Sequence, residues 1–233
     1  MEWIKQLSKL NLKENRYSQY GEEIIIDYIF QQIGTTNKTL VDIGAGGAGK
    51  GLSNSKFLMG NGWGGLLFDM DGHGEGIIKE FVTPFNITDI LKKNVCPKEF
   101  DFLSVDIDSF DYDVIDRLLN SGYCPRLICA EYNGTLNPYS AVKLKYEEGY
   151  TWDGTNKYGF SFNAGLKLFT KHGYTVIYSH KDTNMFAIKN DILGFDSLGI
   201  LYVEGKNADN LFEIEVKQNI YHAINPNAVF IEV

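Results

Sequence analysis

Short apolar runs alternate with amphipathic segments along most of the chain. The runs are too short for helices and have no polar face, which is the pattern of strands buried on both sides of a sheet. They predict strands at residues 39–43, 65–68, 78–85, 100–105 and 126–130. The segments between and around them have apolar positions at helical spacing and predict helices at residues 2–10, 21–33, 53–59, 87–93, 111–119 and 162–172.

The pattern changes after residue 172. Residues 174–179 and 185–189 read as two strands joined by a short polar turn, with no helix between them. Alternating strands and helices predict a parallel sheet, and this ending adds an antiparallel hairpin to it. The sequence therefore predicts a Rossmann-like α/β fold: a seven-stranded, mostly parallel sheet with a C-terminal antiparallel hairpin and helices on both faces.

The last 43 residues fit this scheme less well. We expect one domain over residues 1–190, beginning with the N-terminal helices, and a strand-rich extension over residues 191–233. The strand-like runs of the extension lie at residues 200–203, 212–216 and 229–233. They could extend the sheet or form a subunit contact, so a homo-oligomer joined through this extension is one expectation.

Composition excludes several classes of partner. The 233 residues are 44% hydrophobic and 22% charged, as in an ordinary globular domain with a substantial core. The formal net charge of −8 provides no basic field, so we expect no nucleic acid partner. No apolar run approaches the ~20 residues of a bilayer span, and the N-terminus has no apolar signal core, so we expect no membrane partner and a cytoplasmic location. The three cysteines match no zinc spacing and are expected to be reduced thiols.

The stretch VDIGAGGAGKG, residues 41–51, joins a predicted strand to a predicted helix and fits three binding patterns. As G-x-x-x-x-G-K it approaches a phosphate-binding P-loop, and as G-x-G-x-x-G it matches a dinucleotide fingerprint. As an acidic strand end before G-x-G it also fits an adenosyl-methionine loop. A P-loop needs Ser or Thr after its Lys to bind Mg²⁺, but Gly51 follows Lys50. The P-loop is therefore disfavoured.

Asp69, at the end of the second predicted strand, does not separate the two remaining interpretations. A ribose diol calls for a bidentate acceptor in a nicotinamide enzyme and in a methyltransferase alike. The closing hairpin does separate them, because it is the ending expected of a class I methyltransferase sheet and not of an ordinary nicotinamide domain. An NAD-dependent oxidoreductase is thus the first alternative. The second is a domain that binds adenosyl-methionine without turnover, or a structural partner in a biosynthetic assembly.

Six segments, in order along the chain, resemble motifs of the FkbM-type S-adenosylmethionine-dependent methyltransferases. They are residues 17–23 (YSQYGEE), 41–46 (VDIGAG), 62–69 (GWGGLLFD), 103–111 (LSVDIDSFD), 125–131 (PRLICAE) and 184–186 (NMF). The fourth segment is similar to the family's apolar-x-D-x-E-G-x-E motif, with Asp108 and Asp111 in place of the glutamates and Ser109 in place of the glycine. The resemblance implies a class I methyltransferase fold and an S-adenosylmethionine-dependent O-methyltransferase.

The resemblance also implies that S-adenosyl-L-methionine lies over the loop after the first strand. The residues expected to bind it are Gln19, Asp42, Gly44, Gly46, Ser53, Asn54, Asp69, Asn86 and Asp106. The two glycines are expected to let the backbone approach the methionine part, because a Cβ there would collide with it. Asp69 is expected to accept the ribose hydroxyls, and Asn86 to bond the adenine edge, although a turn role for Asn86 and a helix cap at residues 53–54 are equally good interpretations.

Acidic side chains follow the fourth and fifth predicted strands, where methyl donor and acceptor would meet. We expect Asp106, Asp108 and Glu131 to be catalytic. Asp106 and Glu131, with Asn133, offer oxygen ligands that suit Mg²⁺ or Mn²⁺, which would acidify an acceptor hydroxyl. The metal-free alternative uses one carboxylate as general base. The long aromatic-rich segment at residues 132–160 suits the wall of an acceptor site, so the expected acceptor is a hydroxyl of a saccharide or small natural product.

Overall fold

The computed structural model describes residues 1–14, 16–46, 52–194 and 225–233. Its main feature is a seven-stranded sheet in the order β3-β2-β1-β4-β5-β8-β7. The strands are β1 (Thr39–Ile43), β2 (Gly64–Asp69), β3 (Ile77–Lys79), β4 (Glu99–Val105), β5 (Cys124–Glu131), β7 (Tyr174–His180) and β8 (Asn184–Lys189). The first five are parallel, and β8 runs antiparallel to both β5 and β7. The predicted mostly parallel sheet with a closing hairpin is therefore confirmed.

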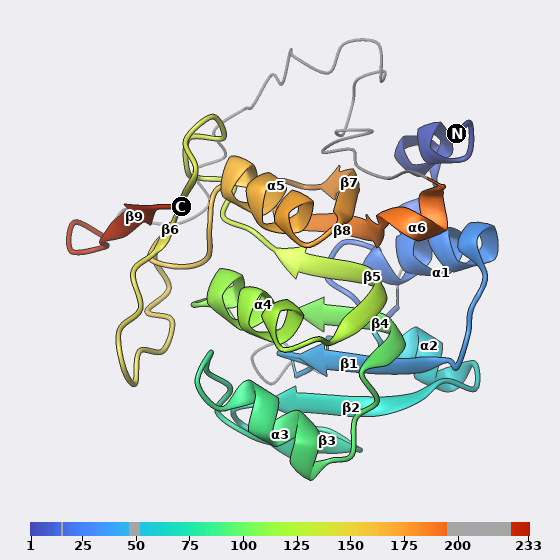
Figure 1. The fold of residues 1–233 in the computed structure, drawn as a ribbon, viewed down its shortest axis with the longest axis horizontal. Helices are drawn as coiled ribbons and strands as arrows, with labels where there is room; N and C mark the ends of the chain where they lie inside the picture. Colours follow the sequence, from blue (N-terminus) through green and yellow to red (C-terminus); the bar gives the residue numbers. More distant parts are fainter. Residues whose placement is uncertain (15, 47–51, 195–224) are drawn as a thin grey trace.

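Helices cover both faces of this sheet (Figure 1). On one face lie α3 (Ile87–Lys93), α4 (Asp111–Asn120) and α5 (Phe162–Lys171). On the other lie the 3₁₀ helix η1 (Ile4–Lys9), α1 (Glu22–Ile33), α2 (Lys56–Gly60) and α6 (Asn190–Leu193). A second short 3₁₀ helix, η2 (Leu12–Glu14), precedes α1. This is the layered Rossmann-like arrangement that the alternating pattern predicts.

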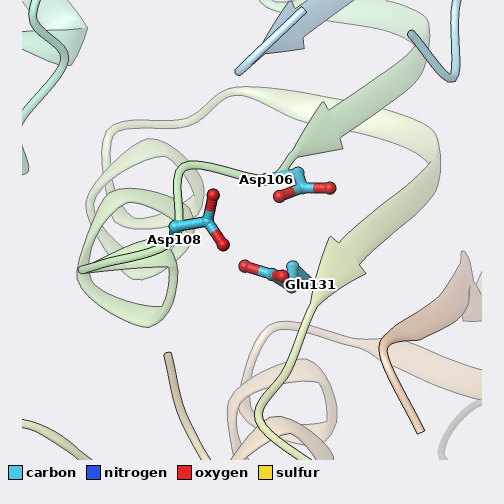
Figure 2. Close-up of side chains that lie close together, drawn as sticks. All are labelled: Asp106, Asp108 and Glu131. Carbon is cyan, nitrogen blue, oxygen red and sulfur yellow. The ribbon is translucent and has the colours of Figure 1, made fainter. Parts of the chain in front are cut away.

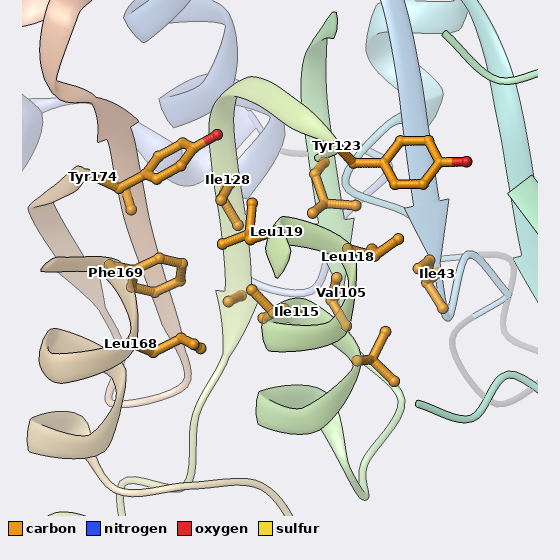
Figure 3. Packing of buried hydrophobic residues seen from close by; sticks show 14 of the residues in the cluster. Ile43, Val105, Ile115, Leu118, Leu119, Tyr123, Ile128, Leu168, Phe169 and Tyr174 are labelled. Carbon is orange, nitrogen blue, oxygen red and sulfur yellow. The ribbon is translucent and has the colours of Figure 1, made fainter. Parts of the chain in front are cut away.

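The central strands are apolar on both faces because each face packs on helices. In β5, Leu127 and Cys129 face the cluster beneath α1, while Ile128 and Ala130 face the cluster beneath α4 and α5. All four are fully buried, and Ile128 lies beside Ile115 and Leu119 of α4 (Figure 3). Burying each large apolar side chain contributes roughly 1.5 to 3 kcal/mol, so these two layers fix the positions of the strand ends.

The order of the strands places the acidic residues at one edge. From β1 the chain passes outward through β2 and β3, then returns to form β4 on the other side of β1. Ligands of open α/β sheets bind at the carboxyl edge of such a reversal. The polar residues Asp42, Asp69, Asp106 and Glu131 all stand at or just beyond the carboxyl ends of these strands.

The opposite edge is held by a buried carboxylate. Asp101, near the start of β4, accepts hydrogen bonds from the backbone amides of Thr36 (2.9 Å), Asn37 (3.0 Å) and Lys38 (2.7 Å). Its Oδ1 also lies 3.3 Å from Nε of Arg126 on β5. The loop between α1 and β1 is thus fastened to the two central strands at the end of the sheet remote from the acidic edge.

Several element boundaries differ from the sequence prediction. The segment at residues 2–10 is a 3₁₀ helix, and the helix predicted at 53–59 is only α2, because Ser53 uses its amide and hydroxyl for contacts outside a helix. The strand predicted at 78–85 ends at Lys79, because Lys79 pairs with Asp69, the last residue of β2; Pro84 lies in the turn before α3. The run at 229–233 forms β9 (Phe230–Glu232), which pairs with β6 (Val142–Leu144) in a separate antiparallel ribbon. The runs at 200–203 and 212–216 lie outside the described residues.

Candidate functional site

A cavity of about 690 Å³ opens at the carboxyl edge of the sheet. The ends of β1, β2, β4 and β5 line it, together with the segment before α1 and the loops that follow β2, β4 and β5. Seven of the nine residues expected to bind the cofactor lie in its wall: Gln19, Asp42, Gly44, Ser53, Asn54, Asp69 and Asp106. The catalytic candidates Asp108 and Glu131 line the same cavity.

The cavity wall has one sign of charge. Among its described residues there is no Lys, Arg or His. The nine acids are Glu22, Asp42, Asp69, Asp71, Glu80, Asp106, Asp108, Glu131 and Asp182. A concave site lined by carboxylates concentrates cations and repels phosphate groups.

Asp69, the last residue of β2, faces the cavity with a 9% exposed side chain. Its Oδ2 accepts the Gly46 amide at 3.1 Å, and its Oδ1 accepts the Asp71 amide at 2.8 Å. These bonds fix the plane of the carboxylate. Each oxygen retains a second lone pair, so the carboxylate can still accept two donors from a ligand diol.

The two glycines of the loop after β1 are also required for packing within the protein itself. A Cβ on Gly44, whose φ is +95°, would lie 1.6 Å from the carbonyl oxygen of Asp106. A Cβ on Gly46 would lie 2.7 Å from Oδ2 of Asp69. Both glycines therefore allow the loop to pack against neighbouring strand ends. Gly46 is not among the residues that line the cavity, and Gly47, Gly49 and Lys50 lie outside the described residues.

Asp42, which is 2% exposed, lies at the base of the cavity. The Ser53 hydroxyl donates to its Oδ2 at 2.8 Å, so Ser53 orients Asp42 and does not cap a helix. Burial raises the pKa of Asp42 above its ordinary value, while the hydrogen bonds of Ser53, Ser55 and Ser104 oppose that rise. The Asn54 side chain donates to the Ser104 hydroxyl at 3.1 Å, and this hydrogen bond joins the segment between β1 and α2 to β4.

The segment before α1 is shaped by a buried glutamate. Glu23 accepts the amides of Arg16 (2.6 Å), Tyr17 (3.1 Å) and Ser18 (3.2 Å), and the Ser18 hydroxyl. Burial alone would raise the pKa of Glu23, but these hydrogen bonds outweigh it and hold the pKa below its ordinary value. These hydrogen bonds hold the segment at residues 16–20 beside the cavity, and Gln19 lies in the cavity wall.

Three carboxylates converge where β4 and β5 end. Asp106 and Asp108 follow β4 and are half-buried, and Glu131 ends β5 with a 6% exposed side chain. One oxygen of each lies within 4.8 Å of the others, and Figure 2 shows the groups pointing toward one another. Burial, then the charges of Asp108 and Asp111, raises the pKa of Asp106 well above its ordinary value. Burial, then the charge of Asp106, does the same to the pKa of Glu131.

Asp111, in the first turn of α4, is a structural residue. It is fully buried and accepts the Ile107 amide at 2.9 Å and the Ser109 amide at 3.1 Å. Burial raises its pKa to about 6. These bonds close the tight loop in which Asp108 has a φ of 53°, a left-handed conformation that aspartate and asparagine adopt more often than most other non-glycine residues.

Two predicted site residues lie elsewhere. Asn86 is not in the cavity wall: its side chain accepts the Thr83 amide at 2.7 Å and donates to the Phe81 carbonyl at 2.8 Å, which is the turn role. Asn133, predicted as a metal ligand, is fully buried and is not among the residues that line the cavity. Its amide nitrogen donates to the carbonyls at residues 156 and 158 and its oxygen accepts the amide of residue 135, so it holds the loop after β5.

The cavity also contains residues that the sequence did not indicate. Glu22 is 1% exposed and accepts from Asn184 at 3.1 Å, which joins α1 to the first residue of β8 beside the cavity. Acidic first turns and strand-initial asparagines are common, so only the fold reveals this pair.

The aromatic segment at residues 132–160 contributes three aromatic side chains to the cavity wall: Tyr150, Trp152 and Tyr158. Other aromatic side chains of the segment pack on neighbouring elements: Tyr146 lies against Phe110 at the start of α4, and Tyr132 against Phe162 of α5.

Comparisons with known proteins add little to this geometry. No protein-family model matches the chain, and no curated protein matches it. The chain is similar to a solved structure from Lactococcus lactis described as a putative hemolysin, with 13% sequence identity and a TM-score of 0.45. The alignment covers 84% of this chain and 96% of that chain. A likeness at this level carries no functional argument. In the part of the chain that the structure describes, no helix is long and apolar enough to cross a bilayer.

Proposed function

We propose that this chain is an S-adenosylmethionine-dependent O-methyltransferase with a class I methyltransferase fold. The observation that carries the proposal is the acid-lined cavity at the carboxyl edge of the sheet, with Asp69 at the tip of β2 and no basic residue among its described lining. Adenosyl-methionine joins a ribose diol, which suits Asp69, to a positively charged sulfonium and ammonium, which suit the surrounding carboxylates.

The same charge distribution argues against the nicotinamide alternative. NAD carries a pyrophosphate with two negative charges, and a cavity with nine acids among its described wall residues would repel it. Dinucleotide sites also place the pyrophosphate beside the loop after the first strand, which here lies near Asp42 and Asp69. The antiparallel ending formed by β7 and β8 supports the methyltransferase fold independently of the charge.

The proposal gives the lining residues separate roles. Bound adenosyl-methionine supplies an electrophilic methyl carbon attached to a sulfonium. Asp69 would accept the ribose hydroxyls, and Asp42 would accept the ligand's ammonium group. Glu131, whose pKa is raised by burial and by Asp106, would take the proton of the acceptor hydroxyl as a general base. The oxygen forms a bond to the methyl carbon as the carbon–sulfur bond breaks, and the bonding electrons leave with sulfur as a neutral thioether.

The proposed acceptor is a hydroxyl of a saccharide or a small natural product. Tyr150, Trp152 and Tyr158 contribute aromatic surface to the wall, and Tyr158 is nearly buried. Aromatic faces pack on the apolar side of a sugar ring, while the acids nearby accept its hydroxyls. A cavity of about 690 Å³ is within the range of sites for small ligands.

Ligand-dependent thermal stability tests the proposal. We expect S-adenosylhomocysteine, in EDTA, to raise the unfolding midpoint of the full chain, whereas NAD and ATP do not. At a hundredfold excess over Kd the ligand stabilises by about 2.7 kcal/mol, which corresponds to roughly 5 to 10 °C for a chain of this size. Asp69→Asn should abolish most of this shift. The matched control is Asp71→Asn, an exposed acid of the same cavity, which should retain it.

Two outcomes would favour the alternatives. Stabilisation by NAD without stabilisation by S-adenosylhomocysteine would replace the proposal with an oxidoreductase. Stabilisation by S-adenosylhomocysteine without methyl transfer to any member of a broad panel of saccharides and phenolic or aliphatic alcohols would favour a binding domain without turnover. Transfer is measured as labelled methyl on the acceptor, with equimolar release of S-adenosylhomocysteine.

A further inference from the structure

The carboxylates of Asp106, Asp108 and Glu131 form a group whose geometry suits a metal ion. One oxygen of each lies within 4.8 Å of the other two, and the three come from β5, the end of β4 and the loop just after it (Figure 2). An octahedral Mg²⁺ at about 2.1 Å from each ligand oxygen sets those oxygens roughly 3 to 4 Å apart. Small rotations of the side chains would therefore bring the group to coordination distance.

One oxygen of this group has no hydrogen-bond partner among the described residues. It is Oε2 of Glu131, whose side chain is 94% removed from solvent; the Glu131 carboxyl otherwise contacts Asp106 of the same group. A buried carboxylate oxygen without a donor is unfavourable, because nothing replaces the water that it has lost. This orphaned oxygen belongs to the side chain that points into the group from β5 (Figure 2).

Among the residues that the structure describes, the cavity wall offers no basic side chain to the group. Nine acids and no described basic side chain line the cavity. Asp111, buried beneath the loop of Asp108, adds another negative charge nearby. Carboxylates at such separations repel one another strongly in a partly buried site. Their charges are balanced either by protons that they share or by a bound cation.

We propose that Asp106, Asp108 and Glu131 bind one Mg²⁺ or Mn²⁺ ion at the floor of the cavity. An all-oxygen ligand set selects these hard cations over zinc. Asp108 takes the place expected for Asn133, whose side chain is fully engaged in the loop after β5. Three protein ligands leave coordination positions open toward the cavity.

The open positions determine which acceptors fit. Two adjacent open positions match two oxygens on neighbouring carbon atoms, so the favoured acceptor is a vicinal diol or a hydroxyl beside a carbonyl. The cation would lower the pKa of the bound hydroxyl. Glu131 would then be a ligand, so a water molecule would remove the proton, and Glu131 would act as the general base only in the metal-free case. This consequence rests on the proposed methyltransferase function, whereas the cation site itself does not.

Mn²⁺ binding to the full chain, in the absence of any adenosyl compound, tests the site. Free Mn²⁺ is measured by electron paramagnetic resonance, and we expect one ion per chain, displaced by Mg²⁺. Asp108→Asn and Glu131→Gln should each weaken binding at least tenfold. Asp71→Asn, which removes a charge from the same cavity outside the group, should change the affinity less than threefold.

Thermal unfolding provides the control for misfolding. In EDTA, Asp108→Asn should unfold at the same or a higher midpoint than the wild type, because it removes a repulsion. Mg²⁺ at a concentration that just saturates the wild type should raise the wild-type midpoint clearly more than that of Asp108→Asn. Absence of Mn²⁺ binding at millimolar concentration, or equal loss of binding in Asp71→Asn and Asp108→Asn, would overturn the proposal in favour of shared protons or a diffuse acidic surface.

The two proposals fail separately. Mn²⁺ binding without stabilisation by S-adenosylhomocysteine would support the cation site and contradict the proposed methyltransferase function. Stabilisation by S-adenosylhomocysteine in EDTA, with no Mn²⁺ bound, removes the cation site and leaves a carboxylate base as the means of proton removal.

Discussion

Gly44 and Asp106 pack so closely that a Cβ on Gly44 would lie 1.6 Å from the Asp106 carbonyl oxygen. The contact joins the loop after β1 to the end of β4, on either side of the point where the order of the strands reverses. The Asp106 amide in turn donates to the Ile43 carbonyl at 2.9 Å. The position of a candidate catalytic carboxylate therefore depends on a glycine in the neighbouring loop.

Gly44→Ala is expected to destabilise the fold. The added methyl overlaps backbone that cannot move without displacing β4, and the φ of +95° is itself unfavourable for alanine. Together these effects predict a loss of about 3 kcal/mol or more in the free energy of unfolding, measured by urea denaturation. The matched control is Gly60→Ala at the end of α2, where a Cβ meets nothing within 4 Å. A Gly44→Ala protein as stable as Gly60→Ala would contradict the predicted overlap.

Glu23→Gln should loosen the segment that covers the cavity. Gln cannot accept all the amide and hydroxyl donors that converge on the Glu23 carboxylate, so we expect a loss of about 2 to 3 kcal/mol at pH 7. The folded-state pKa of Glu23 lies below the ordinary value of 4.5, so its contribution is complete above about pH 4.5 and is lost as the pH falls through the folded pKa. The difference in the free energy of unfolding between the wild type and Glu23→Gln should therefore become smaller as the pH falls.

The control for that experiment is Glu75→Gln, which removes an exposed carboxylate. Urea denaturation at pH 7, 5, 4 and 3 would show its stability parallel to that of the wild type throughout. If the stability difference between Glu23→Gln and the wild type stays constant or widens between pH 4.5 and 3, the negative charge of Glu23 is not what holds residues 16–18 in place.

Asp101→Asn should cost stability without affecting the cavity. Asp101 accepts three backbone amides and pairs with Arg126, and loss of its charge leaves Arg126 without its carboxylate partner. We expect the free energy of unfolding to fall by about 3 kcal/mol. The control is Asp89→Asn, which removes an exposed carboxylate paired with Lys92 and should leave the free energy of unfolding unchanged. Ligand binding below the unfolding transition should be unchanged, because Asp101 lies at the opposite edge of the sheet. A changed affinity for S-adenosylhomocysteine in calorimetry would refute that separation.

Trp152 should report on the acceptor. Of the three tryptophans only Trp152 lines the cavity, and its indole nitrogen donates to the Thr155 carbonyl at 2.7 Å. We expect acceptor saccharides to change the intrinsic fluorescence of the wild type and not that of Trp152→Phe. Trp152→Ala should lower kcat/KM for the acceptor about tenfold, the loss of one aromatic packing contact, and alter S-adenosylhomocysteine affinity less than threefold. An equal loss of both affinities would place Trp152 at the cofactor instead.

The sequence by itself determined the sheet, because that information is local. Apolar runs such as residues 100–105 are strands since a buried parallel strand has no polar face, and the absence of a helix between residues 179 and 185 required the hairpin. The acids at the strand ends could be recognised in the same way. Helix boundaries differed from the prediction where a residue forms hydrogen bonds outside the helix, as Ser53 does with Asp42 and the Tyr17 carbonyl before α2.

Tertiary structure alone decided which polar groups meet. Asn133 and Asp108 lie at similar distances along the chain from a strand end, but Asn133 finds backbone partners in the loop after β5, and the left-handed turn at Asp108 leaves its carboxylate beside Asp106 and Glu131. Glu22 and Asn184 are 162 residues apart and share a hydrogen bond that no sequence pattern announces. The orphaned oxygen of Glu131 is likewise a property of packing, because burial removes water only once the strands and loops around it have closed.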